Sequence, residues 1–150
     1  MQRLFLTFFY SGLSPVAPGT IGSLAAGLVG YLILLYFPTD TLFLLAVLIS
    51  VIGIQEINKY EKATNTHDDK SIVIDEVAGL WIAFSFTSNS LIELVLAFLF
   101  FRLYDIYKPS LIGKIDREYK GGIGVMGDDI LAGILAGIST LIVFQLYSHL

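Results

Sequence analysis

The feature that most constrains the fold of this chain is a succession of apolar segments that carry almost no charge. Between Leu4 and Thr39 the sequence has no charged residue. Of all residues, 55% are hydrophobic and 15% are charged, whereas soluble domains carry about 25% charged residues. The apolar segments cover residues 21–37, 41–55, 72–86, 91–104 and 130–147. Since a membrane-spanning helix needs about 20 apolar residues, we predict an all-α fold, a polytopic membrane helical bundle of about five helices that forms one domain over residues 1–150.

Composition also narrows the classes of function. Cysteine is absent, which excludes disulfides, thiolate metal sites and cysteine nucleophiles. The formal net charge is −4, and no basic patch interleaved with aromatic residues is present, so we expect no nucleic-acid partner. The sequence gives no indication of an oligomeric state.

The basic residues indicate the orientation of the bundle. The connections at 38–40 and 87–90 hold no Lys or Arg. The nine basic residues all lie in the alternate connections or near the N-terminus: Arg3, Lys59, Lys62, Lys70, Arg102, Lys108, Lys114, Arg117 and Lys120. Because cytoplasmic loops carry an excess of Lys and Arg, we predict a cytoplasmic N-terminus. Pro15 and Pro18 interrupt the first apolar run, which leaves open whether residues 4–20 form a helix or a re-entrant loop.

Acidic residues gather at the same predicted membrane face. They open the third segment, end the fourth, occupy the following loop and open the last segment: Asp68, Asp69, Asp75, Glu76, Asp105, Asp116, Glu118, Asp128 and Asp129. The polar stretch "SGLSPVAPGTIGS" (11–23) enters the first segment on that side. A carboxylate at membrane depth is costly and usually marks a functional site. We therefore expect four polar clusters, distant in the chain, to meet at this face.

Several of these groups also have a purely structural interpretation. Asp128 and Asp129 would complement the positive end of a helix dipole. Arg102 and Asp105, three residues apart on one helical face, would form a local ion pair. Asp75 lies about one turn inside its segment, close enough to the interface for its carboxylate to reach water.

Three further patterns concern packing. Gly133 and Gly137 form a G-x-x-x-G pair, which permits close approach of membrane helices. The glycine-rich segment 121–129 is expected to be a flexible loop that leads into the last helix. Trp81 is expected at the membrane interface, where tryptophan is enriched.

The polar residues favour a phosphate-handling enzyme. Carboxylates without cysteine form an all-oxygen site, which suits Mg²⁺. Arg102 and Lys108 would bind a phosphate, and the hydroxyls of Thr20 and Ser23 would orient it near a helix N-terminus. Attack by metal-activated water and attack by a carboxylate both remain open. The alternatives are a small cation carrier or channel that uses the same acidic cluster, and a non-catalytic membrane assembly or lipid-binding factor.

Three blocks of the sequence resemble the bacterial phosphatidylglycerophosphatase A family. They are "SGLSPVAPGTIGSLAA" (11–26), "HDDKSIVIDEVAGLWI" (67–82) and "FRLYDIYKPSLIGKIDREYKGGIGVMGDDILAG" (101–133), in the order and spacing of the family. The resemblance implies Mg²⁺-dependent removal of the terminal phosphate of phosphatidylglycerol phosphate, which gives phosphatidylglycerol and inorganic phosphate. It also implies a phospholipid substrate in the bilayer and a multi-pass protein of the bacterial inner membrane whose active site faces the cytoplasm.

The resemblance and the polar chemistry together suggest a role for each residue. The expected catalytic residues are Asp75, Glu76, Asp105, Asp116 and Asp129. The expected Mg²⁺ ligands are Asp75, Glu76, Asp105, Asp128 and Asp129. The expected phosphate-binding residues are Thr20, Ser23, Arg102 and Lys108. Tyr10, Leu111 and residues 67–71 depart from the family pattern, and these departures concern loop geometry.

Overall fold

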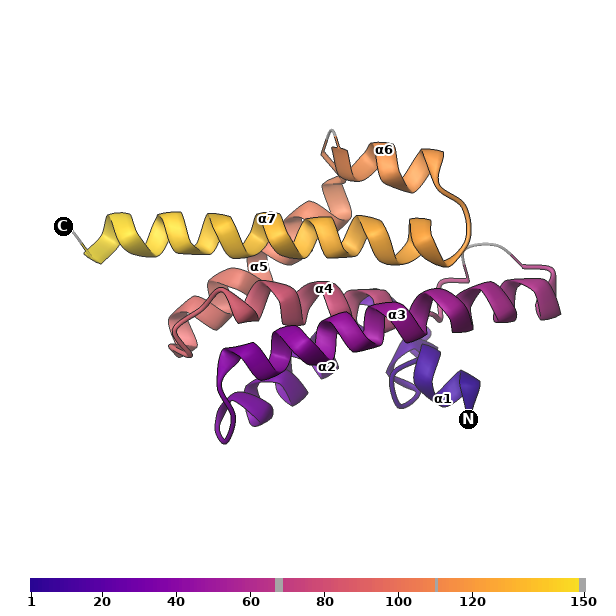
Figure 1. Ribbon diagram of the computed structural model, residues 1–150, viewed down its shortest axis with the longest axis horizontal. Coiled ribbons are helices and arrows are strands. Elements are labelled where there is room, and N and C mark those ends of the chain that lie inside the picture. The colour runs from indigo at the N-terminus through magenta and orange to yellow at the C-terminus, as the bar shows by residue number, and fades with distance from the viewer. Residues whose placement is uncertain (67–68, 110, 149–150) are drawn as a thin grey trace.

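The computed structural model describes residues 1–66, 69–109 and 111–148, and all regular structure within them is helical (Figure 1). The elements in chain order are α1 (Gln2–Leu6), the 3₁₀ turn η1 (Ser11–Leu13), α2 (Pro18–Leu34), α3 (Thr39–Thr64), α4 (Ile74–Ser85), α5 (Leu91–Tyr107), α6 (Leu111–Glu118) and α7 (Gly122–Ser148). Each predicted apolar segment coincides with most of one helix, namely α2, α3, α4, α5 or α7. The all-α prediction is confirmed, whereas α1 and α6 lie outside the five predicted helices.

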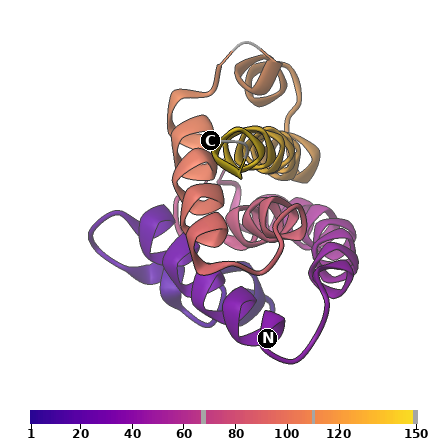
Figure 2. The same cartoon turned by 90° about the vertical axis from the view of Figure 1, so that its left-hand side faces the viewer.

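Helix α4 is the centre of the fold. It has 12 residues, and nine of them are buried, namely Ile74 and Val77–Phe84. A helix that is apolar on every side needs neighbours on every side, and α4 packs against α7, α3, α2 and α5 (Figure 2). Asp75 and Glu76 occupy its first turn, as predicted, so the central helix itself carries two of the acids.

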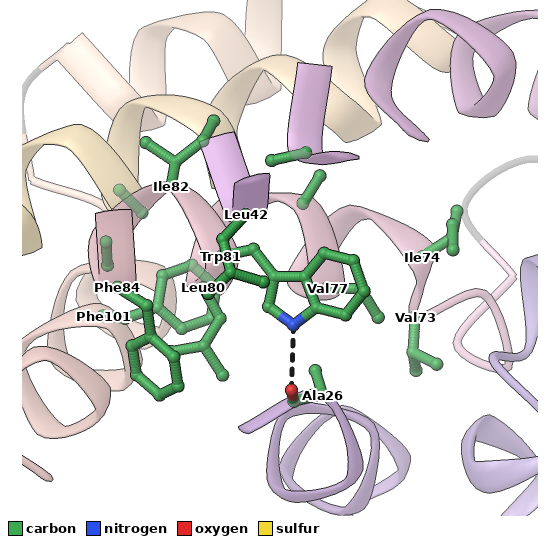
Figure 3. Close-up of a cluster of buried hydrophobic side chains, with 14 of the residues drawn as sticks. Ala26, Leu42, Val73, Ile74, Val77, Leu80, Trp81, Ile82, Phe84 and Phe101 are labelled. Atoms are coloured by element: carbon green, nitrogen blue, oxygen red, sulfur yellow. Dashed lines mark hydrogen bonds between the residues drawn. The ribbon is translucent and has the colours of Figure 1, made fainter. Parts of the chain in front are cut away.

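Trp81 lies in the core and not at a membrane interface. Its side chain is only 4% exposed, and its indole Nε1–H donates a hydrogen bond to the carbonyl oxygen of Ala26 at 2.9 Å (Figure 3). The ring of Phe8 contacts it edge-on, with the centroids 6.3 Å apart. The expectation of an interfacial Trp81 is therefore wrong, because Ala26 on α2 supplies the hydrogen-bond acceptor that a buried indole requires.

Among the described residues, helices α3 and α7 are the two that are long and apolar enough to cross a membrane by length and composition. Helix α2 is apolar but shorter. Large apolar side chains are exposed along α2, α3, α5 and α7, and exposed apolar surface on this scale is typical of contact with lipid or protein. Both long helices exceed the predicted segments, because α3 continues to Thr64 and α7 begins at Gly122.

Residues 4–20 contain both helical and non-helical parts. A short helix, α1, is followed by Phe8, Phe9 and Tyr10, all with positive φ, and then by η1 and the proline-bounded entry to α2. The segment is tied to the rest of the fold because the backbone N–H of Val73 donates to the carbonyl oxygen of Leu6 at 2.9 Å. It is therefore a folded turn beside the start of α4 and not one continuous helix.

The long helices alternate in direction along the bundle. The N-terminus, the start of α4 and helix α6 lie at one end, whereas the connections from α2 to α3 and from α4 to α5 lie at the other (Figure 1). The basic residues of α1, α6 and the α3 C-terminus share the first end with Asp75 and Glu76. This arrangement places the chain-distant polar segments close to one another.

Candidate active site

Carboxylates from three helices converge on one cavity of about 210 Å³. Helix α4 contributes Asp75 and Glu76, α5 contributes Asp105, and α7 contributes Asp128 and Asp129. Lys108, Tyr119, Val125 and the glycines Gly121 and Gly124 complete the wall. We call these five carboxylates the acidic cluster. Their convergence confirms the prediction that the separate acidic motifs meet at one end of the bundle.

A close helix crossing brings the acids of α4 and α7 together. A Cβ built on Gly79 would overlap the carbonyl oxygen of Asp129 and would lie 2.7 Å from the ring of Phe101. A Cβ on Gly133 would overlap the carbonyl oxygen of Gly79. Only glycine permits this backbone approach, so Gly79 and Gly133 position Asp75 beside Asp129. The predicted packing role of Gly133 is confirmed.

Arg102 links three helices at the edge of the acidic cluster. Its Nη1 contacts Asp105 Oδ2 at 2.5 Å and Glu76 Oε1 at 3.4 Å. The same nitrogen donates to Ser23 Oγ at 3.1 Å, and Nη2 donates to Thr20 Oγ1 at 3.3 Å. The expected Arg102–Asp105 ion pair is present, and it is one part of a wider network. The hydroxyls of α2 therefore orient the guanidinium, which is a contact that the sequence did not reveal.

Small residues at the start of α2 allow this approach. A Cβ on Gly19 would overlap Glu76 Oε1, and one on Gly22 would lie 2.9 Å from Glu76 Oε2. Because α2 begins at Pro18, with proline at a position suited to a helix start, its first turn can lie directly against the Glu76 carboxylate. The segment 11–23 therefore lies beside the acidic cluster, as predicted, because Gly19 and Gly22 leave room for the Glu76 carboxylate.

Lys108 approaches the acidic cluster from the end of α5. Its Nζ lies 2.5 Å from Asp128 Oδ2. Its backbone is left-handed, with φ of 42°, where it ends the helix, a conformation that non-glycine residues adopt at a cost. The side chain of Asp128 also accepts a hydrogen bond from the backbone N–H of Asp129 at 3.0 Å. Lys108 therefore neutralises part of the charge of a buried carboxylate.

The placement of Asp128 and Asp129 differs from the prediction. They lie inside α7 rather than at its first turn, and they are only 4% and 3% exposed. The glycine-rich segment before them is helical from Gly122 onward, so the expected flexible loop is absent. The side-chain oxygen of Asn58 on α3 accepts a hydrogen bond from the backbone N–H of Gly122 at 2.8 Å. A cap supplied from another helix explains why glycines that usually favour loops begin α7 here.

The remaining acids have different surroundings. Asp69 lines an adjoining cavity of about 250 Å³, which shares Asp75 and Glu76 with the first. The backbone N–H of Ser71, followed by the Tyr60 hydroxyl, lowers the pKa of Asp69 from its ordinary value. Asp116 lies in helix α6 rather than in a loop, and its side chain lies outside the part of the chain that the structure describes. His67 and Asp68 likewise lie outside the described residues.

The donor atoms of the acidic cluster fit a hard cation by their chemistry. Asp75 Oδ1 and Glu76 Oε2 are buried without a hydrogen-bond partner among the described residues. Five carboxyl groups face two basic side chains, Arg102 and Lys108, so acidic groups outnumber basic ones at the cavity. A carboxylate that is ionised in such a buried place requires a partner or a metal ion. In the described residues, no three acidic or histidine side chains converge closely enough to enclose a metal ion as they stand. The Mg²⁺ ligand set therefore stays a prediction.

Tyr119 and Val125 border the cavity although the sequence reasoning did not single them out. Tyr119 follows α6, and Val125 lies one turn before Asp129 on α7. If residues 122–129 had been predicted as a helix, Val125 would have been expected on the same helical face as Asp128 and Asp129. No comparable signal marks Tyr119, because its position depends on how α6 folds back over α7.

The chain is similar in sequence to known proteins over most of its length. The model of the Phosphatidylglycerophosphatase A family matches residues 4–144. Phosphatidylglycerophosphatase A of Escherichia coli K12 is 41% identical over 139 residues, which cover 91% of this chain and 80% of that protein. The protein of the same name from Haemophilus influenzae Rd is 36% identical over 137 residues, 91% of this chain and 84% of that protein.

A third relative carries a different name. A candidate phosphatidylinositol-3-phosphatase of Bacteroides thetaiotaomicron is 37% identical over 139 residues, which cover 88% of this chain and 86% of that protein. No solved structure matches the chain. The family match covers all of α4 and α5 and most of α7, the three helices that supply the acidic cluster. The chain therefore belongs to the phosphatidylglycerophosphatase A family.

Proposed function

We propose that this protein is a Mg²⁺-dependent lipid phosphatase that removes the terminal phosphate of phosphatidylglycerol phosphate. The products would be phosphatidylglycerol and inorganic phosphate. Membership of the family makes the chain a hydrolase of phosphoric monoesters. The observation that carries the proposal is the acidic cluster with two unpartnered oxygens, beside Arg102 and Lys108, at one end of an otherwise apolar bundle.

The membrane location rests on the apolar helices and on the distribution of charge. Helices α3 and α7 meet the length and composition of membrane spans, and the lateral surfaces of α2 and α5 are also apolar. The end that carries the acidic cluster also carries the basic residues, and such loops face the cytoplasm. We therefore place the active site at the cytoplasmic face of the bacterial inner membrane.

Each group of residues has a defined task in this proposal. Asp75, Glu76 and Asp129, with Asp105 and Asp128, would hold Mg²⁺, which when bound supplies charge neutralisation at a phosphoryl oxygen. Arg102 would bind the phosphate through its fork of N–H donors, because Thr20 and Ser23 hold that fork in position. Lys108 would provide the second positive charge.

Burial of the cluster also serves the chemistry. Electrostatic interactions strengthen where water is excluded, and the helices hold the charged groups in place before substrate arrives. Preorganised charges of this kind stabilise a transition state without reorganisation. The cluster would therefore act on the phosphate at the membrane surface while the lipid chains remain in the bilayer.

The cation carrier receives less support from the structure. A transport path needs polar groups along the membrane depth. Glu93 is buried near the opposite end of the bundle, and it is bonded locally to the hydroxyl and the backbone N–H of Ser88. The α4 segment between the two ends is apolar, so the described residues favour a site at one face.

Phosphate release from a panel of lipid phosphates tests the proposal. The purified protein is incubated with phosphatidylglycerol phosphate, phosphatidic acid and phosphatidylinositol 3-phosphate, with Mg²⁺ or with a chelator. We expect release from phosphatidylglycerol phosphate that depends on Mg²⁺. Preference for the inositol lipid would move the substrate assignment toward that of the Bacteroides relative, and cation uptake into proteoliposomes without phosphate release would refute the phosphatase.

A further inference from the structure

An apolar groove runs along the outside of the bundle between α2 and α5. It has a volume of about 290 Å³, and its lining includes Leu24, Gly27 and Leu28 from α2, Val95 and Phe98 from α5, and Phe84 from α4. Helix α2 packs mainly on α4, helix α5 packs on α7 and also on α4, and α2 and α5 hardly contact each other. Helix α4 therefore forms the bottom of the space between them, and the outer side of this space is open to the surroundings. We call this space the α2–α5 groove.

The groove begins directly beside the active-site cluster. At its head, Arg102 of α5 donates to Ser23 of α2 at 3.1 Å. One helical turn further along each helix stand Gly27 and Phe98, and a Cβ on Gly27 would lie 3.8 Å from the Phe98 ring. Because residues four apart share a helical face, the Arg102–Ser23 contact leads directly into the groove.

Close helix packing does not require a glycine at position 27 in the groove. A Cβ on Gly27 would meet its nearest neighbour, Leu80, at 3.6 Å, an ordinary contact distance. By contrast, a Cβ on Gly22, one turn nearer the acids, would lie 2.6 Å from Val73. Glycine at position 22 thus permits close packing, whereas glycine at position 27 leaves space that a larger side chain would occupy.

The groove is shorter than the hydrocarbon depth of one bilayer leaflet and fits within it. From Leu24 to Tyr31 on α2 the helix rises roughly 10 Å at about 1.5 Å per residue, and the hydrocarbon of one leaflet is about 15 Å thick, half of the core. Leu24, Leu28 and Val95 are at least half exposed, so the groove opens sideways toward the hydrocarbon. A second apolar cavity, of about 390 Å³, lies beneath α1, and none of the acids or of the Arg102 network lines it.

The geometry points to the α2–α5 groove as the binding site for one acyl chain of the lipid phosphate substrate, whose head group reaches the acidic cluster from the side. This inference rests on the proposed phosphatase function. The groove positions the phosphate by holding the chain that is attached to it. Because lipid tails are as apolar as the groove, the bound chain contributes orientation and packing rather than burial from water.

Filling the groove tests the inference. In Gly27→Leu the new side chain would occupy the space beside Phe98. We expect the kcat/KM for diacyl phosphatidylglycerol phosphate, divided by that for its water-soluble, chain-free head group, to fall about five- to tenfold, because the chain loses its orientation. Val47→Phe is the control, since Val47 is exposed on α3 and lines neither apolar cavity. If Gly27→Leu left this ratio of kcat/KM values unchanged, or if the ratio fell equally in the control, the groove would not be the acyl-chain site.

A binding measurement separates the groove from the catalytic proposal. A lipid phosphate with a photoreactive group in one acyl chain is incorporated into phosphatidylcholine nanodiscs with the protein, and labelled peptides are mapped. We expect labelling of α2 and α5 in excess of the exposed face of α3, and loss of that excess in Gly27→Leu. Labelling equal to that by photoreactive phosphatidylcholine would refute the inference. Absence of phosphate release from every substrate would refute the phosphatase and leave the labelling result to decide the groove.

Discussion

Replacement of Gly79 by alanine tests whether the α4–α7 crossing positions the acids. The new Cβ would lie 2.7 Å from the Phe101 ring and 2.9 Å from the carbonyl carbon of Asp129, whereas ordinary contacts begin at 3.4 Å. The two helices would have to separate by at least several tenths of an ångström, and overpacking of this kind costs about 1–3 kcal/mol. Because Asp75 lies on α4 one turn before Gly79, we expect activity to fall by as much as ~100-fold.

Thermal unfolding in detergent and phosphate release measure the two effects. Gly27→Ala is the matched control for stability, because its Cβ would have an ordinary 3.6 Å contact and alanine is favoured over glycine in a helix by about 1 kcal/mol. We expect Gly27→Ala to melt at or above the wild-type temperature and Gly79→Ala to melt below it by about 2–4 °C for each kcal/mol lost. Equal melting temperatures, with full activity in Gly79→Ala, would refute the crossing as the positioning device.

Three further substitutions examine separate parts of the structure. Asp129→Asn should raise the melting temperature in chelator by roughly 2–4 °C for each kcal/mol of repulsion removed, whereas a lower melting temperature would contradict mutual repulsion in the cluster. Trp81→Phe should lose about 1–2 kcal/mol of stability with its hydrogen bond to Ala26, as measured by denaturant unfolding; wild-type stability would show that this bond contributes nothing. Lys108→Met removes the ion pair with Asp128, and kcat/KM should fall roughly 10–100-fold, since hydrogen bonds to charged groups contribute about 1.5–3 kcal/mol. A change in kcat/KM below twofold would exclude Lys108 from phosphate binding.

The apolar segments and the meeting of the acids could be predicted because both depend on local sequence. Charge is excluded from long apolar helices, so the acids and bases must stand near their ends. The alternation of basic and neutral connections then indicates which ends lie together. Asp75, Asp105 and Asp129 are consequently found at one cavity, as expected from the sequence.

Features that depend on tertiary contacts could not be predicted. The glycines before Asp128 favour a loop by local propensity, but the Asn58 side chain caps Gly122 and the backbone of Ile54 packs against it. Trp81 suits an interface as well as a core, and only the Ala26 carbonyl decides between them. A neighbouring helix decides both the helical start at Gly122 and the core position of Trp81, and the local sequence of either segment does not show that neighbour.

Short helices were also missed for a physical reason. Helix α6 has eight residues, and an isolated helix of that length is marginal in water. It forms against α7, and its exposed face carries a loose Lys114–Glu118 pair at 3.9 Å. Asp116 thereby moves from an expected loop into a helix, and its proposed catalytic role remains a prediction.

The central claim is that the buried carboxylates act with Mg²⁺ on a lipid phosphate. The most direct measurement compares phosphate release from phosphatidylglycerol phosphate by the wild-type protein and by Asp75→Asn, each purified in folded form and assayed with Mg²⁺ and with chelator. We expect the wild type to release phosphate with Mg²⁺ and not with chelator. We expect Asp75→Asn to lose at least about 100-fold, the effect of removing a group that stabilises the transition state. Wild-type release that persists in chelator, or near-normal release by Asp75→Asn, would contradict the central claim.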